Sequence, residues 1–242
     1  MPSHLSAVVL DADDPDRLAR FWADLLGRTV APDTRGPLLA GTPTQVGLRF
    51  THATTAKAGL NRLHLHLTSH DADEQQATVD RVIRLGGAHL DVGQLPEEGH
   101  IVLADPEGNE FCVIEPRNAY LAGCGHLGEV ACDGTQQVGY FWAEALGWPL
   151  VWDQDQETAI QSPHGGTKVA WGGPPLEAKH GRNRQRFELT VPASEFTHEV
   201  DRLTDLGATV LVREPDADVV ELADPDGNEF ELHREQPAVE RA

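Results

Sequence analysis

The chain has 242 residues, with 19 basic and 39 acidic side chains and a formal net charge of −20. Such an acidic excess repels phosphate backbones and anionic lipid, so we expect neither nucleic acid nor a membrane as a partner. Three cysteines without a CxxC pair, no signal-like start and no long apolar run favour a cytoplasmic globular protein.

The first predicted elements are a strand and a helix. Residues 7–10 are apolar and β-branched, as is typical of a short buried strand. Asp14-Pro15 supplies an N-cap and a proline for the first helical turn, and Gly27 suits a left-handed C-cap. Between them, apolar residues follow the spacing of one helical face: Leu18, Phe21, Trp22, Leu25 and Leu26.

A second strand and helix follow, and then a hairpin. Residues 62–68 alternate leucine with polar side chains, which predicts a strand, and a helix is predicted over about 73–85. A strand near 100–104 leads into a tight Asp-Pro-Glu-Gly-Asn turn at 105–109, and residues 111–114 form the return strand. Each unit is therefore a strand, a helix and further strands.

The chain also repeats itself. Three blocks of the first half return in the same order in the second half, at a nearly constant spacing of about 120 residues. They are Phe21-Trp22-Ala23 with Phe141-Trp142-Ala143, Val79-Asp80-Arg81 with Val200-Asp201-Arg202, and Ala104–Phe111 with Ala223–Phe230. The pattern predicts two homologous domains, residues 1–117 and 118–242, and four units in all.

A βαβββ unit with Phe-Trp on its first helix and Asp-Pro-x-Gly-Asn at its last hairpin resembles the vicinal oxygen chelate (VOC) superfamily. This superfamily includes glyoxalase I, bleomycin-resistance proteins and extradiol dioxygenases, and within it the chain is similar to actinobacterial glyoxalase-like proteins. The resemblance implies an α+β fold, in which tandem units form two glyoxalase-like domains with curved mixed sheets around small-molecule cavities. Four units can also form an internal pseudo-dimer, so we expect a monomer or a homodimer.

In metal-dependent members of the superfamily, each cavity has four ligand positions, on the first and last strands of two units. The resemblance carries these positions onto Ala7 and Leu127, the neighbourhoods of 46–48 and 168–170, His64 and Arg186, and Cys112 and Glu231. No complete ligand set results. The resemblance therefore implies a degenerate metal site.

Substitute ligands are available because alternate residues of a strand share a face. His66 lies two residues from His64, Glu129 two from Leu127, and Glu188 two from Arg186. His64, His66 and Glu129 would suit a divalent metal such as Fe, Mn, Ni or Zn. The alternative is that both imidazoles line a cavity and bond to polar neighbours. Likewise, Arg186 and Glu231 fit a salt bridge that fills a vacated metal site, with ligand binding by these two residues as the alternative.

Other side chains are candidates for ligand contact. Trp152 and Trp171 can stack on a flat ligand, and Cys112 is either a reactive thiol or a buried, inert one. The basic stretch 179–186 is interpreted as a solvated linker, with a mobile lid that contacts an anionic group as the alternative.

Three functions remain open. The incomplete ligand set favours a metal-free protein that sequesters or carries a small molecule. The second possibility is a metal-dependent lyase, isomerase or dioxygenase that uses His64, His66 and an acidic residue such as Glu129. The third is an enzyme that works without metal, with Glu231 or Glu188 as the base.

Overall fold

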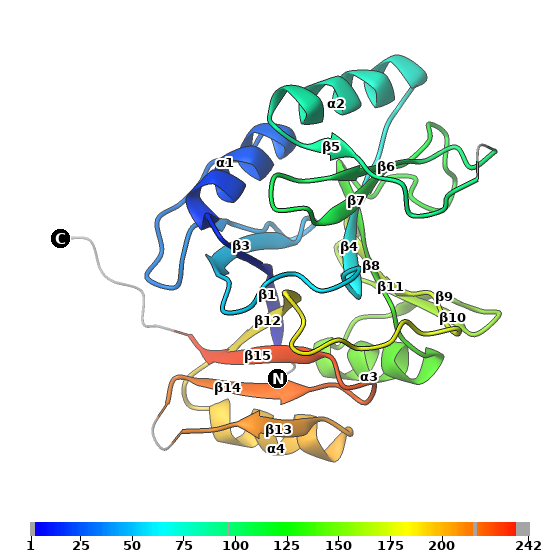
Figure 1. Cartoon of the computed structure of the whole chain (residues 1–242). Helices are drawn as coiled ribbons and strands as arrows, with labels where there is room; N and C mark the ends of the chain where they lie inside the picture. The colour runs from blue at the N-terminus through cyan, green and yellow to red at the C-terminus, as the bar shows by residue number, and fades with distance from the viewer. Residues whose placement is uncertain (1–2, 96, 215–216, 236–242) are drawn as a thin grey trace.

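The computed structural model describes residues 3–95, 97–214 and 217–235 (Figure 1). The first half contains β1 (His4–Ala12), α1 (Pro15–Leu26), β2 (Leu38–Leu39), β3 (Gly47–His52), β4 (Leu63–Leu67), α2 (Ala72–Arg84), β5 (Ala88–His89), β6 (Ile101–Ala104) and β7 (Glu110–Val113). The second half contains β8 (Leu127–Cys132), α3 (Gln136–Leu146), β9 (Leu150–Gln154), β10 (Glu157–Gln161), β11 (Lys168–Trp171), β12 (Gln185–Val191), α4 (Phe196–Asp205), β13 (Thr209–Val212), β14 (Val219–Ala223) and β15 (Glu229–Arg234).

These strands form two mixed sheets, and each sheet joins one unit from each half. Sheet A has the order β13-β14-β15-β12-β1-β3-β2, so it combines the first unit with the fourth. Sheet B has the order β5-β6-β7-β4-β8-β11-β10-β9, so it combines the second unit with the third. The halves meet where β1 pairs with β12 and β4 pairs with β8, both antiparallel. The expected α+β arrangement of tandem units is confirmed.

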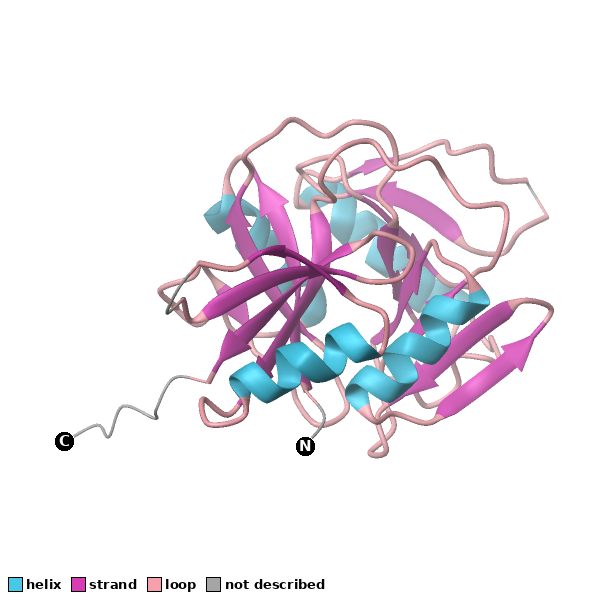
Figure 2. Ribbon diagram, turned by 90° about the horizontal axis from the view of Figure 1, so that it is seen from below, coloured by secondary structure: helices cyan, strands magenta, loops and turns pink. Residues whose placement is uncertain are grey.

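The helices form where the sequence supplies caps and an apolar face. In α1, the Asp14 side chain accepts a hydrogen bond from the Arg17 backbone, and Gly27 takes a left-handed φ of 64° at the end. The helices lie on the outside of the sheets, with α1 and α2 together at the top of Figure 1 and α3 and α4 at the bottom (Figures 1 and 2). The described helices include none that is long and apolar enough to span a membrane.

Each Asp-Pro-x-Gly-Asn turn is tied to a helix of its own half. The Asp105 carboxylate accepts hydrogen bonds from the turn backbone at Asn109 (2.9 Å) and from the indole of Trp22 on α1 (3.3 Å). Asp224 makes the equivalent bond to Trp142 on α3 (3.2 Å). The repeated motif is therefore a structural clamp between hairpin and helix.

Candidate functional site

Strands of sheet B and the segments beside them line a predominantly apolar cavity of about 650 Å³. Residues from both halves line it. They include His64, His66, His100, Cys112, Tyr120, Glu129, Trp152 and Trp171. A volume in this range is typical of sites that enclose a small molecule.

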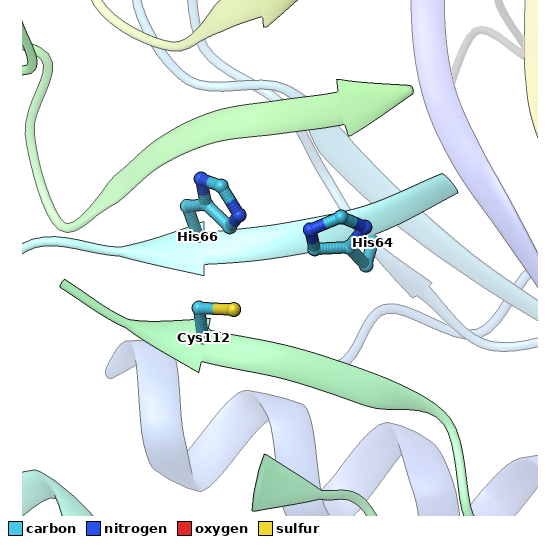
Figure 3. Close-up of side chains that lie close together, drawn as sticks. All are labelled: His64, His66 and Cys112. Carbon is cyan, nitrogen blue, oxygen red and sulfur yellow. The ribbon is translucent and has the colours of Figure 1, made fainter. Parts of the chain in front are cut away.

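Three potential metal ligands converge on the wall of this cavity. His64 and His66 project from the same face of β4, and Cys112 projects beside them from the neighbouring strand β7 (Figure 3). One imidazole nitrogen of each histidine and the Cys112 sulfur all lie within 4.8 Å of one another. Two imidazoles and a thiol form a donor set that zinc and other borderline-soft divalent metals accept.

A carboxylate from the other half completes the group. Glu129 on β8 is paired with His66, and its Oε2 lies 2.7 Å from His66 Nδ1. On the neighbouring strands, His66 is paired with Cys112 on β7 and Glu129 is paired with Lys168 on β11, so these four residues form one row across the sheet. Because Glu129 occupies Nδ1, the other ring nitrogen of His66 is the one available to a metal.

Burial and hydrogen bonding set the two histidines apart. Desolvation, with the charges of His66 and His100 adding to it, lowers the pKa of His64 to about 3, so its imidazole is neutral near pH 7. Burial also acts to lower the pKa of His66, but hydrogen bonds to Cys112 and Glu129 outweigh it and raise that pKa to about 9. Without a metal, the structure therefore favours one neutral and one protonated imidazole at this wall.

Aromatic side chains shape another part of the cavity. The rings of Trp152 and Tyr120 meet edge to face with centroids 5.9 Å apart, and the ammonium of Lys168 lies 3.8 Å from the Tyr120 ring centroid. Burial and the neighbouring Glu129 raise the pKa of Tyr120, so its hydroxyl stays protonated. The indole nitrogen of Trp152 is buried and has no hydrogen-bond partner among the described residues.

Comparison with known proteins agrees with this architecture. The sequence matches the family described as "Glyoxalase-like domain" twice, over residues 7–114 and 129–233. The chain belongs to the glyoxalase-like family. Both halves of this glyoxalase-like protein carry the domain, as the internal repeat predicts.

Solved structures show the same fold as this glyoxalase-like chain. Glyoxalase I from Zea mays matches with a TM-score of 0.66 and 15% identity, over 96% of this chain and 92% of that one. A putative dioxygenase from Bacillus subtilis matches with a TM-score of 0.59 and 12% identity, over 98% and 86%. No curated protein sequence matches significantly.

The strand register corrects one expectation about the family's ligand positions. We expected Leu127 at the first-strand ligand position, with Glu129 on the same face of the strand. This expectation is wrong, because the two side chains lie on different faces. A bulge in β8 shifts the pairing between Glu129, opposite His66, and Leu127, opposite Leu67. Leu127 is consequently fully buried in the core, whereas Glu129 lines the cavity. His66, and not His64, shares the row of Glu129 and Cys112.

The equivalent face of sheet A of this glyoxalase-like protein is filled by ion pairs. Arg49 on β3 binds Glu188 through Nε at 2.6 Å. Arg186 bridges Glu231 at 2.5 Å and Asp11 at 2.8 Å. The pairing of Arg186 with Glu231 is therefore the salt bridge that was one of the two sequence-based alternatives.

This network also bears on the acidic residues proposed as bases. Burial tends to raise the pKa of Glu231, but the hydrogen bond from His233 and the charge of Arg186 outweigh it and lower that pKa to about 2. Glu188, Glu231 and His233 do form a second cluster of potential metal ligands. The guanidinium groups of Arg49 and Arg186 already bind its carboxylates, so the cluster does not fit a cation. Arg186, Glu188 and Glu231 thus lie apart from the residues that line the open cavity.

The structure brings together six of the sequence-based candidates: His64, His66, Cys112, Glu129, Trp152 and Trp171. Trp171 is 1% exposed and belongs to the hydrophobic core as well, which limits its contact with a ligand. Sequence reasoning missed Tyr120, which lies in the segment between the halves where no motif marks it. It also missed the contact of Lys168 with the Tyr120 ring, although that residue belongs to the expected ligand neighbourhood 168–170.

Proposed function

We propose that the cavity of sheet B binds a small, largely apolar molecule beside a divalent metal held by His64, His66 and Cys112. The observation that carries this proposal is the convergence of these three ligand atoms within 4.8 Å at the wall of the cavity. Three protein ligands that leave one position open are the usual composition of a catalytic metal site. The protein is accordingly a metal-dependent enzyme of the VOC type.

The other cavity residues have separate tasks. Glu129 fixes the orientation of the His66 ring through the 2.7 Å contact to Nδ1, and its carboxylate is placed to move a proton of the substrate. Trp152 lines the cavity and offers its ring to a flat part of the substrate. When bound, the metal would supply Lewis acidity toward an oxygen of the substrate.

Metal content tests this proposal directly. We expect about one divalent metal ion per chain in the purified protein by elemental mass spectrometry. The double substitution His64→Ala/His66→Ala should abolish it, and Glu129→Gln should lower metal affinity by about 10- to 100-fold. His100→Ala is the matched control, because His100 lines the same cavity outside the cluster. Full metal content in the double variant would disprove the assigned ligands.

A second candidate, metal-free binding or carriage of the small molecule, is supported by one observation. The His66 ring already bonds to Glu129 at 2.7 Å, so this polar group has a partner without an ion. This candidate predicts no retained metal after incubation with Fe(II), Mn(II), Ni(II) or Zn(II). Binding of aromatic compounds would still weaken in Trp152→Ala and would not depend on added metal.

A further inference from the structure

A second pocket, of about 260 Å³, lies between the two segments that connect the units within each half. Residues 55–62 form one wall and residues 178–185 the other. It shares Leu60, Asn61 and Arg62 with the large cavity, so the two spaces adjoin. Its cationic lining residues are Lys57, Arg62, Arg182 and Arg184, and no Asp or Glu is among the described residues that line it.

Internal symmetry provides a comparison for Arg184. Its counterpart in the first half is Arg62, because both arginines accept the equivalent backbone hydrogen bond. The backbone N–H of Asp133 donates to the Arg62 carbonyl, and the backbone N–H of Asp11 donates to the Arg184 carbonyl, each at 2.8 Å. Arg62 Nε binds the Asp133 carboxylate at 2.8 Å. The two arginines therefore begin from the same backbone position.

Arg184 lacks the partner that Arg62 has. The Asp11 carboxylate is taken by Arg186 at 2.8 Å and by Thr51 at 2.6 Å. Arg184 keeps a bond to the Asp11 carbonyl, and its other carboxylate contacts, Asp13 and Glu107, are both 3.7 Å away. These distances exceed those of good charge-assisted hydrogen bonds.

Arg184 is thus a buried cation with an incomplete set of partners. The residue is 7% exposed, and its Nε has no hydrogen-bond partner among the described residues. Leaving a donor of a buried charged group without an acceptor is costly, so the site favours an added hydrogen-bond acceptor such as an anion.

We propose that this pocket binds an oxyanion, the carboxylate or phosphate group of a small molecule. Arg184 Nε donates to the anion from the buried end. Lys57 and Arg182 contribute charge from the two walls, although both also pair with carboxylates outside the pocket. Lys57 pairs with Glu110 at 2.9 Å, and Arg182 pairs with Glu221 at 2.9 Å and with Asp11 and Glu231 at 3.5 Å each. The site does not depend on the metal cluster.

Inorganic phosphate is the first probe, titrated calorimetrically into the full chain with ionic strength held constant by chloride. We expect Arg184→Gln to weaken phosphate binding about tenfold or more, as loss of a hydrogen bond to a charged group does. Lys57→Gln and Arg182→Gln should each weaken it severalfold without disturbing a buried residue. Arg81→Gln, which removes an exposed arginine paired with Asp24, is the charge-matched control and should bind as the parent does.

Phenyl phosphate distinguishes a free anion from one attached to the molecule in the large cavity. Tighter binding than inorganic phosphate, with the gain lost in Trp152→Ala, would support the site and place the anion on the ligand of the cavity. Equal affinities would support a site for a free oxyanion. No phosphate binding in the parent, or binding that persists in Arg184→Gln and in both wall variants, would overturn the proposal. His64→Ala/His66→Ala should bind phosphate normally, which separates this site from the metal site.

Discussion

At the scale of single residues, the equivalent faces of the two sheets differ in chemistry. One carries potential metal ligands, and the other carries ion pairs. Glu129 and His66 on sheet B are replaced at the paired positions of sheet A by Ala7 and Glu188. Glu188 is fully buried and is held by Arg49, so a guanidinium provides the positive charge that a metal could otherwise provide. Removing one member of such a pair leaves the other charge buried and is strongly destabilising.

Glu231 makes this network sensitive to acid. Its pKa is about 2 in the folded protein against an unperturbed value of 4.5, so the carboxylate stabilises the fold fully above that value. The contribution, up to about 3 kcal/mol, should disappear as the pH falls through the window between 4.5 and 2. The measurement is the free energy of unfolding in urea, for the parent and for Glu231→Gln, from pH 7 to pH 2.5.

Subtracting the free energy of unfolding of Glu231→Gln from that of the parent cancels the contribution of groups that titrate in both proteins. We expect a constant difference above about pH 5 that narrows on acidification. A difference that stayed constant down to pH 2.5, or widened, would contradict the role of Glu231 in the network.

At the scale of elements, most of the architecture could be predicted and the register could not. The period of apolar residues identified α1 and β4, because burial of one face imposes that period directly. The expectation that Leu127 occupies the first-strand ligand position failed. It was reached by counting residues back from the helix, which assumes that the connection between strand and helix has the same length in both halves. Ala7 precedes Phe21 by two more residues than Glu129 precedes Phe141. Both strands carry a bulge at the equivalent place, so the difference lies in the segment that leads from the strand to the helix phenylalanine. Nothing in the local sequence reveals that this segment differs in length between the halves.

The sequence also identified most of the candidate residues, but not which of them lie in the open cavity and which lie in the ion-pair network of sheet A. Strand alternation correctly placed His64 and His66 on one face. Which carboxylate reaches them depends on the pairing of β4 with β8, a contact between halves that periodicity does not encode. For the same reason, the separation of Glu231 from the open cavity became visible only in the three-dimensional structure.

Gly128 in the bulge of β8 offers a test at this scale. A Cβ at this position would lie 2.5 Å from the Thr68 side chain, which is itself held by a hydrogen bond to the Gly125 carbonyl. Gly128→Ala should therefore destabilise the protein by about 1–3 kcal/mol and, by displacing Glu129, weaken metal binding. Gly172→Ala is the control, since a Cβ there meets no atom within 4 Å. Parent-like stability in Gly128→Ala would show that the bulge is not a tight constraint.

At the scale of the whole molecule, neither half contains a complete sheet. Residues 1–117 supply the strands on one side of β1 and β4, and the partner strands β12 and β8 come from the other half. Four units in one chain thereby form the pseudo-dimer internally, and we propose that the protein is a monomer.

The two halves produced separately should therefore depend on each other. We expect residues 1–117 alone to expose the β1 and β4 edges and to self-associate or aggregate. Mixing with residues 118–242 should give a one-to-one complex, measurable by light scattering, that regains the metal-binding cavity. A half that stayed monomeric and unfolded cooperatively on its own would contradict the interlocked arrangement.

Because the two halves are separate segments of one polypeptide, a substitution in one site is inherited independently of the other site. In a homodimer of identical chains, every substitution appears in both sites at once, so one site cannot be given up while the other is kept. Here Glu188 and His66 occupy equivalent positions but are encoded separately, so selection could turn one site into internal support and leave the other open. Mutations on sheet A should accordingly be tolerated or rejected for their effect on folding, and mutations on sheet B for their effect on the ligand.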